Sequence, residues 1–355
     1  MLRLSFFSVV SVISVVNFFP STVVVILPPH MAEMARENST DGNASLALVA
    51  ATLFWGFGFT WAKLGGEAVN AAMGLRDGAY VGPIFLLAWR FTIASILWAI
   101  LFREARTGWT LRSVMRAAML GSFLGSGLVL QHLGLDRTSE AVAAFLTALT
   151  IVFVPLIMTL VVRKPPTALQ WAGVGLATLG VWLMTGASPS GLGAGEMLAL
   201  GGAIVFSGYI IAVNVIVPHE NPARMALGQF AATALMTIIA CLYVHAGPEA
   251  LAQSGRILGA PQIWLNAALL IVFSTIGSFG LLTFFQPRVD PTRAALIYLV
   301  EPIFAAAYAY VATGRGLSSI GMLGAALILI ANLFVELREA QLKRRTTPAP
   351  DVAPV

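Results

Sequence analysis

Glu301 stands in the middle of an apolar segment, residues 292–313, and Pro302 follows it directly. A carboxylate at the centre of a membrane-spanning helix costs about 2.5–3.5 kcal/mol on insertion scales, so it needs a partner or a use. Two interpretations are open. In the first, Glu301 has a structural role: it hydrogen-bonds backbone carbonyls freed by a kink at Pro302, or it pairs with a buried cation and joins two helices. Alternatively it lies on a transport pathway, as a proton-coupling group or a ligand for a cationic substrate group.

The composition indicates that lipid is the solvent of this chain. Of its 355 residues, 58% are hydrophobic and 10% are charged, and the mean hydropathy is +0.85. A soluble domain has about 25% charged residues. The net charge of +5 does not indicate a nucleic-acid partner, because Lys and Arg fall in short loops, where they act as topology signals.

Motifs for enzymatic chemistry or for a cofactor are missing from the sequence. The single cysteine, Cys241, excludes a disulfide framework and a CxxC metal or redox site. Walker A and HExxH sequences are absent, and the four histidines are scattered. We therefore expect neither an enzyme nor a bound metal or cofactor.

Ten apolar runs each approach the roughly 20 residues that a helix needs to cross the hydrocarbon core. They are residues 45–64, 83–102, 117–135, 141–162, 168–186, 195–217, 225–246, 262–286, 292–313 and 317–337. The breaks between them combine Gly, Pro or charge. This pattern predicts an all-α integral membrane protein with ten transmembrane helices, followed by a polar, Pro-rich tail, residues 338–355, which we expect to be disordered.

The two ends of the chain carry further signals. Residues 1–44 are an extension whose apolar first part, residues 1–30, is an additional anchor helix, a signal-like leader or the product of a start assigned too early. The last interpretation, with Met31 or Met34 as the true start, is favoured. Lys and Arg are more frequent in the loops on the side of residues 1–44, which predicts that both termini of the ten-span core are cytoplasmic.

The sequence contains an internal repeat. A shift of 151 residues places residues 143–161 on residues 294–312, with Ala143 on Ala294 and Phe153 on Phe304. The copies are residues 45–186 and 195–337, with five apolar runs each. Because each copy crosses the membrane an odd number of times, the second copy is expected to be inverted in the membrane. Inverted repeats are typical of secondary transporters, whose substrate site lies at the midplane between the copies.

Polar side chains recur at matching depth in the two copies. The same shift places Thr150 on Glu301 and Thr147 on Tyr298. In each copy the two residues share one face of a helix, and we expect these faces to look into the bundle. Other runs supply further candidates, each with interhelical hydrogen bonding or packing as the alternative. They are Gln131, His132, Tyr209, Asn214, Ser274, Ser278 and Trp55.

Four other residues receive structural predictions. Trp61 and Lys63 are expected to anchor at the membrane interface, with the Lys63 amine reaching water. Gly121 and Gly125 are predicted to be sites of close helix packing. The position of Arg90, at the head of the second run, does not decide between an anchoring and a functional role.

Several motifs resemble those of the EamA-type transporters of the drug/metabolite transporter superfamily. They are FWGFGFTWAK at 54–63, AWRF at 88–91, RTSEAVAAFLTALTIVFVP at 137–155 and PTRAALIYLVEPIFAAAYAYV at 291–311. The resemblance covers roughly residues 45–337. It implies a ten-helix, inverted-repeat exporter of a bacterial inner membrane, with a cavity lined by the first, third, fourth, sixth, eighth and ninth runs.

The chain departs from the family pattern at three places. Gly314-Arg315 and Arg163-Lys164 replace the Gly-Glu that the family commonly has after the corresponding helix of each copy. Ile151 occupies the place where the family often has the proline that matches Pro302. These departures concern the coupling residues and leave the expected fold unchanged.

We therefore expect a secondary active transporter that exports small metabolites, such as amino acids or related amines, by alternating access around a midplane cavity. The alternatives are a non-transporting membrane sensor or assembly protein and a carrier of lipid-linked or nucleotide-sugar cargo. The expected partners are a small-molecule substrate, the lipid bilayer and, as candidate coupling ion, protons, with no nucleic acid. Monomer and homodimer both stay open.

Overall fold

The computed structural model describes residues 29–76, 78–150, 152–154, 156–157, 168–184, 192–285 and 297–346, and these residues form helices and loops without a β-strand. By its contacts the chain divides into the units Met1–Gly42 and Asn43–Val355. Residues 1–28, and with them most of the apolar leader, lie outside the described residues. The packing described below is that of the second unit.

The helices follow the order of the apolar runs. The first copy contains α2 (Pro29–Ala72), α3 (Val81–Leu101), α4 (Leu111–Leu135), α5 (Glu140–Ala148) and α7 (Ala168–Met184). The second copy contains α8 (Ala194–Ile216), α9 (Pro222–Tyr243), α12 (Pro261–Leu269), α13 (Ser278–Phe285), α15 (Glu301–Thr313) and α16 (Ser319–Thr346). A π-helical segment, η3 (Leu270–Gly277), joins α12 to α13. Short helices, η1 (Arg103–Arg106), η2 (Val217–His219), α10 (Gly247–Ala252) and α11 (Ser254–Leu258), lie in the loops.

Six helical segments are long and apolar enough to cross a membrane. They are Asn43–Ala72, Val81–Leu101, Leu111–Leu135, Ala194–His219, Pro222–Tyr243 and Pro261–Leu282. Three shorter apolar helices are Glu140–Val154, Trp171–Met184 and Ser319–Ala331. The all-helical membrane architecture is thus confirmed in the described part of the chain, while the count of ten spans stays a prediction.

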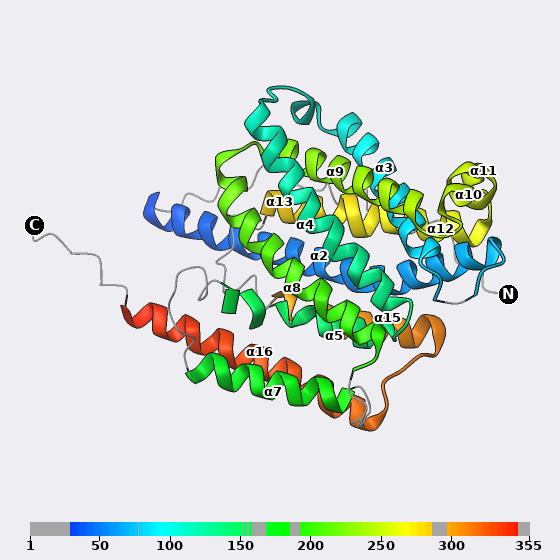
Figure 1. The fold of residues 1–355 in the computed structure, drawn as a ribbon. Helices are drawn as coiled ribbons and strands as arrows, with labels where there is room; N and C mark the ends of the chain where they lie inside the picture. The colour runs from blue at the N-terminus through cyan, green and yellow to red at the C-terminus, as the bar shows by residue number, and fades with distance from the viewer. Residues whose placement is uncertain are drawn as a thin grey trace, which may run out of the picture. The chain divides into compact units, whose positions relative to one another are not determined.

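Equivalent helices of the two copies lie side by side and run in opposite directions. Where α3 meets α9, the Trp98 indole donates to the Ala223 carbonyl at 2.9 Å, and the Phe91 and Phe230 rings lie 5.8 Å apart. The residue numbers therefore rise along α3 as they fall along α9. The pair α7 and α16 behaves likewise, since Gly180 meets Ile328 and Gly324 meets Met184 (Figure 1). This is the geometry expected of two inverted copies.

Local sequence explains where several helices start. The side chains of Thr110, Ser139 and Asn221 each accept a hydrogen bond from a backbone amide in the first turn of the helix that follows. Such N-caps satisfy amides that have no partner within the helix. Pro222 and Pro261 stand at the starts of α9 and α12, where a missing N–H has no cost.

Glycines set the distance between neighbouring helices. A Cβ atom added at Gly121 of α4 would lie 2.7 Å from the Gln229 carbonyl oxygen of α9, and one at Gly125 would lie 2.4 Å from the Met236 side chain. The prediction that this pair packs against a helix is confirmed. Small residues of this kind let membrane helices approach closely.

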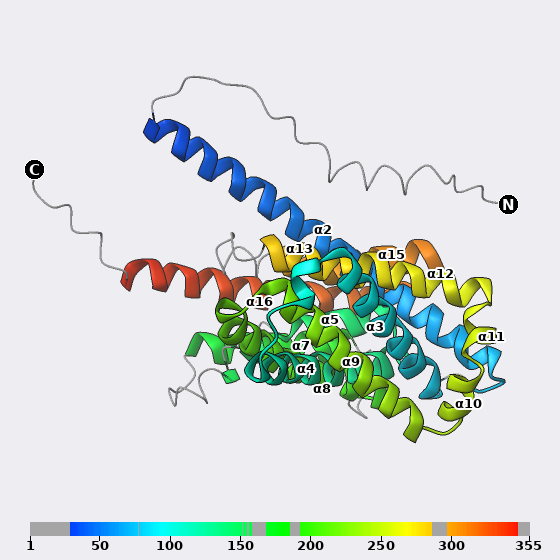
Figure 2. The same cartoon turned by 90° about the horizontal axis from the view of Figure 1, so that it is seen from above.

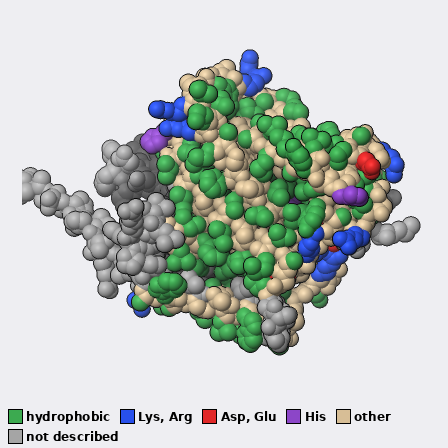
Figure 3. All heavy atoms as spheres, viewed as in Figure 1, with side chains coloured by type: hydrophobic (Ala, Val, Ile, Leu, Met, Phe, Trp, Pro, Cys, Tyr) green, Lys and Arg blue, Asp and Glu red, His purple; other side chains and the backbone are tan. Residues whose placement is uncertain are grey.

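Large apolar side chains cover much of the outer surface. Leu111, Tyr243 and Val311 are 78%, 87% and 82% exposed. Figure 3 shows hydrophobic side chains across one face, with Lys and Arg gathered toward its margins. An apolar surface bordered by positive charge fits a lipid environment.

The last helix is longer than the sequence indicates. We predict a disordered tail from residue 338, but α16 continues to Thr346 (Figure 2). The segment from Arg338 to Arg345 consists almost wholly of strong helix formers, and the first proline comes at Pro348. Residues 347–355 lie outside the described residues.

Candidate functional site

Glu301 is the first residue of α15. Leu299 and Val300 form a turn, and Pro302 occupies a first-turn position of the helix. A proline there is favourable, because the helix has no use for its missing amide hydrogen. The α-helix is therefore interrupted before Pro302, and the proline belongs to a helix start. Val300 nevertheless keeps helical backbone angles, and its amide donates to the Ile297 carbonyl at 3.1 Å. The shared face of Tyr298 and Glu301 stays a prediction.

The first copy is interrupted at the equivalent place. α5 ends at Ala148, and Leu149 forms a turn before residues 150 and 152–154 return to helix. Under the 151-residue shift, Leu149 corresponds to Val300. Thr147 and Thr150 therefore flank one break as Tyr298 and Glu301 flank the other. Broken helices at membrane depth are typical of transporter binding sites.

Helix α2 meets the start of α15 at Gly56. A Cβ atom at Gly56 would lie 2.9 Å from the Glu301 carbonyl oxygen and 2.8 Å from the Phe304 Cβ. Only a residue without a side chain allows this approach. The backbone of Glu301 is thereby held against the helix that also carries Trp55.

Trp55 and Tyr298 lie beside this break. Their rings are 6.2 Å apart, and the Trp55 ring meets Phe279 edge-on at 5.5 Å. The Tyr298 hydroxyl is buried without a hydrogen-bond partner among the described residues, and Glu301 is its electrostatic neighbour. The structure thus brings three predicted site residues, Trp55, Tyr298 and Glu301, into one region.

A second aromatic group lies further along α2 and α15. Phe57 stacks on Tyr308 at 4.2 Å, and the Trp61 indole donates to the Tyr308 hydroxyl at 2.9 Å. Trp61 and Lys63 are buried, so their predicted place at the membrane interface is wrong. The Lys63 ammonium donates to the carbonyls of Leu135 and Thr138, at the end of α4. The interface prediction fails because α2 continues to Ala72, well past both residues.

Gln131 and Thr147 are also brought together. The Gln131 amide donates to the Thr147 hydroxyl at 2.9 Å, and that hydroxyl donates to the Ala143 carbonyl at 2.9 Å. The neighbouring His132 is 5% exposed, and its ring interacts with the Leu128 carbonyl of its own helix. Gln131 therefore ties α4 to α5, whereas His132 makes no hydrogen bond to another of the described helices.

The other predicted residues are spread over the bundle. The Ser278 hydroxyl donates to the Ala51 carbonyl of α2 at 3.0 Å, which joins α13 to α2. The Tyr209 hydroxyl donates to Gln229 at 2.8 Å, which joins α8 to α9. These bonds match the structural alternative of interhelical contact. The side chain of Asn214 lies outside the described residues.

Arg90 emerges from the structure as a buried cation that the sequence did not assign. It lies near the middle of the 21-residue helix α3 and is 4% exposed. Its Nε donates to the Thr275 hydroxyl at 2.6 Å and its Nη2 to the Ser274 hydroxyl at 3.1 Å. Both acceptors lie in the π-helical η3, a distortion that is frequent at functional sites. An arginine well inside an apolar run was the available signal.

Both copies of the repeat match a known protein family. Residues 43–186 and 193–337 each match the EamA-like transporter family. The chain belongs to this family, which is part of the drug/metabolite transporter superfamily. An uncharacterized transporter of Archaeoglobus fulgidus is 25% identical over 295 residues, which cover 83% of this chain and 86% of that protein. A crystal structure of a protein with 17% identity covers 85% of this chain and 99% of its own, with a TM-score of 0.54, and shares the fold.

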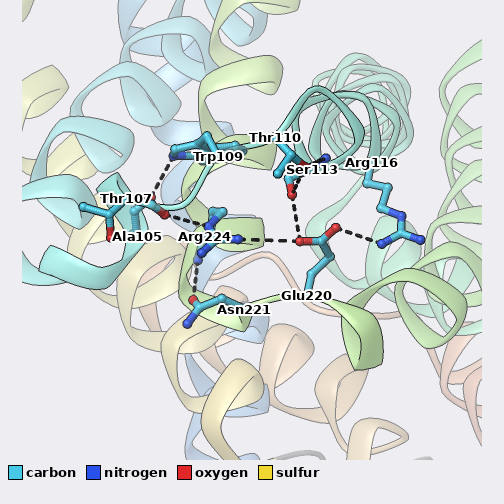
Figure 4. A network of polar contacts seen from close by, with 9 residues as sticks. All are labelled: Ala105, Thr107, Trp109, Thr110, Ser113, Arg116, Glu220, Asn221 and Arg224. Atoms are coloured by element: carbon cyan, nitrogen blue, oxygen red, sulfur yellow. Dashed lines mark hydrogen bonds and ion pairs between the residues drawn. The ribbon is translucent and has the colours of Figure 1, made fainter.

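In this EamA-family transporter, ion pairs join the two copies at one end of the bundle. Glu220, in the loop before α9, accepts from Arg116 at 2.8 Å and from the Ser113 hydroxyl at 2.9 Å. Arg224 lies 3.7 Å from the same carboxylate (Figure 4). The hydrogen bond from Arg116, helped by Ser113 and by both positive charges, lowers the pKa of Glu220 although burial opposes this shift.

The opposite end of the bundle has its own network. Arg315, in the loop after α15, lies 3.3 Å from Glu67 and 3.2 Å from Glu140. Burial alone would lower the pKa of Arg315, but the two carboxylates outweigh it and raise the pKa. The ion pairs of the described residues thus lie at the two ends, away from Glu301 and Arg90.

Proposed function

We propose that this member of the EamA-like family is a secondary active transporter that exports small amine-bearing metabolites, such as amino acids or related amines, by alternating access. It acts in the inner membrane, with both termini of the helical core in the cytoplasm. The basic residues around Arg116 and Arg224 would then face the cytoplasm, in agreement with the usual bias of positive charge.

The observation that carries this proposal is the position of Glu301. Its carboxylate belongs to the first residue of a half-helix, at a break that the other copy repeats. No cation of the described residues forms an ion pair with it. A carboxylate inside a membrane protein without a fixed partner is suited to a mobile one, either a proton or the amine of a substrate.

The surroundings of Glu301 suit the same ligand. Trp55 and Tyr298 present aromatic rings beside the break, and such rings attract ammonium groups by about 0.5–2 kcal/mol. If a proton and a substrate amine compete for the Glu301 carboxylate, binding of one displaces the other. This competition would couple export of the substrate to entry of a proton. The paired antiparallel helices α3–α9 and α7–α16 supply two similar halves that can rock against each other.

The test is uptake into proteoliposomes that contain the purified protein. The probes are radiolabelled amino acids and the corresponding amines, with and without a pH gradient. Wild-type protein is expected to transport at least one of them, faster with the gradient. Glu301→Gln is expected to lose most of this rate together with its pH dependence.

The matched control is Glu249→Gln, the same change at an exposed residue of α10, which should transport normally. Wild-type rates and an unchanged pH dependence in well-inserted Glu301→Gln would remove the assigned role of Glu301. Absence of flux for the whole panel with wild-type protein would refute the proposed substrate class, and favour a sensor or a different cargo.

A further inference from the structure

We propose that Arg90 binds a carboxylate group of the transported substrate. The inference deepens the function proposed above and rests on it. It assigns to the substrate a second charged group besides the amine, so zwitterionic amino acids become the favoured cargo over simple amines.

The guanidinium of Arg90 is anchored, yet it keeps one nitrogen free. Nε and Nη2 donate to Thr275 and Ser274 of η3, while Nη1 makes no hydrogen bond within the described structure. These three bonds, one to Thr275 and two to Ser274, fix the plane of the guanidinium from one side. A fixed plane with an open edge is the arrangement that receives a carboxylate oxygen.

No acidic residue of the described chain forms an ion pair with Arg90. An arginine side chain keeps its proton in proteins. The ion pairs of the described residues all involve Arg116, Arg224 or Arg315, and Arg90 takes part in none of them. A buried cation without an anion is strongly unfavourable, and hydroxyl acceptors compensate it only in part. A bound anion would supply the missing charge.

His132 of α4 is a buried electrostatic neighbour of Arg90. It is 5% exposed, and its ring interacts with the Leu128 carbonyl one turn earlier in the same helix. Arg90 itself therefore supplies the donors of the proposed site.

The open edge of Arg90 suits a monoanion with two oxygen atoms. Nη1 carries two N–H groups, which can donate to the oxygens of one carboxylate. A phosphate, which carries more charge, would need more than one cation. A free inorganic monoanion such as chloride shares the required chemistry and is separated from the substrate by the experiment.

The site has a structural link to the region of Glu301. Ser274, which binds Arg90, packs on Gly58 of α2, where an added Cβ would lie 2.5 Å from the Ser274 Oγ. Gly56, two residues earlier, packs on the backbone of Glu301. Helix α2 thus contacts the backbone of Glu301 and the serine that accepts from Arg90, and a movement of α2 would affect both.

The experiment compares amino acids with their amides, which keep the amine and the shape but lose the negative charge. The pairs are leucine and leucinamide, phenylalanine and phenylalaninamide, and serine and serinamide, in wild-type proteoliposomes. The amino acid of the best pair is expected to be transported at least about tenfold faster than its amide, because a charged hydrogen bond is lost. Equal transport, or a preference for the amide, overturns the proposal without using a variant.

Variants then locate the effect. Arg90→Gln is expected to reduce the amino-acid rate at least about tenfold and to leave the amide rate within about twofold, whereas Arg90→Lys should retain an intermediate preference. Arg256→Gln, the same change at an exposed arginine, should change neither rate. Equal loss of both rates in Arg90→Gln would mean that Arg90 only joins α3 to η3, and would refute the inference.

Three further outcomes separate the sources of failure. If replacing chloride by gluconate abolishes transport of both members of a pair, the site binds a free anion and the substrate assignment is wrong. If amines move in a proton-dependent way but no amino acid is preferred, the carboxylate site fails while the proposed function stands. If no probe moves at all, the proposed function itself fails.

Discussion

Arg315 and Glu140 join the two copies of the chain at a distance of 3.2 Å. The Glu140 side chain is completely buried, whereas that of Arg315 is 44% exposed. Glu140 also opens α5 after the N-cap Ser139, where the positive end of the helix favours its negative charge.

Arg315→Gln is expected to destabilise the protein by about 1–3 kcal/mol, because it leaves a buried carboxylate without its cation. The measurement is the midpoint of thermal unfolding in detergent. The double variant Arg315→Gln with Glu140→Gln should recover part of the loss, because the second change removes the unpaired charge. A double variant no more stable than Arg315→Gln would contradict this account of the pair.

The Glu220 carboxylate should contribute to the pH dependence of the free energy of unfolding at acidic pH. Its pKa is lowered from the ordinary value of 4.5, so its stabilising contribution is complete above that value and is lost as the pH falls through the lowered pKa. Glu220→Gln is therefore expected to be about 1 kcal/mol less stable than wild type at pH 7. The difference should shrink as the pH falls below about 4.5.

Unfolding midpoints of both proteins between pH 7 and pH 3 would check this sign. Glu104→Gln, in η1, is a control that removes a carboxylate from a loop outside the Glu220 network. Parallel curves for wild type and Glu220→Gln across the whole range would exclude the predicted linkage.

Tyr308 tests the aromatic group between α2 and α15. Tyr308→Phe keeps the stack on Phe57 but removes the acceptor of the buried Trp61 indole N–H. An unsatisfied buried donor costs about 1–3 kcal/mol, so the unfolding midpoint should fall. Tyr243→Phe, at a side chain that is 87% exposed, should leave it unchanged. Equal midpoints for Tyr308→Phe and wild type would show that the indole finds another partner.

Apolar length and internal repetition predict much of this fold, because both are properties of the sequence itself. The membrane helices and the packing role of Gly121 and Gly125 follow from local composition. The ends of the helices are harder to predict from the sequence. Lys63 reads as an interface residue only if α2 stops near residue 64, and its continuation to Ala72 buries it.

The candidate site is less predictable, because it depends on which side chains meet across helices. A single apolar run does not reveal that Arg90 of α3 binds Thr275 of η3, since those residues are far apart in sequence. Glu301 could be recognised as a candidate from the sequence, because a charged residue in the middle of an apolar run is costly and therefore conspicuous. The pairing of Gln131 with Thr147 required the fold.

Gly56 and Gly58 provide the most direct test of how closely α2 must approach its neighbours. A methyl group at Gly56 would meet the Glu301 carbonyl oxygen at 2.9 Å, and one at Gly58 would meet the Ser274 hydroxyl at 2.5 Å. Alanine also favours a helix by about 1 kcal/mol over glycine, so any loss must come from the contacts. Gly56→Ala should therefore move α2 away from the start of α15 and reduce transport at least about tenfold, as small displacements at a site can.

Gly175→Ala is the matched control, since nothing lies within 4 Å of a Cβ atom added to this glycine of α7. It should transport at the wild-type rate and unfold at an equal or slightly higher temperature. Gly58→Ala should be less destabilised than Gly56→Ala, because the Ser274 hydroxyl can rotate whereas the Glu301 backbone cannot, although this rotation breaks the hydrogen bond from Arg90. Wild-type transport by Gly56→Ala would mean that close approach of α2 to Glu301 is not needed for function.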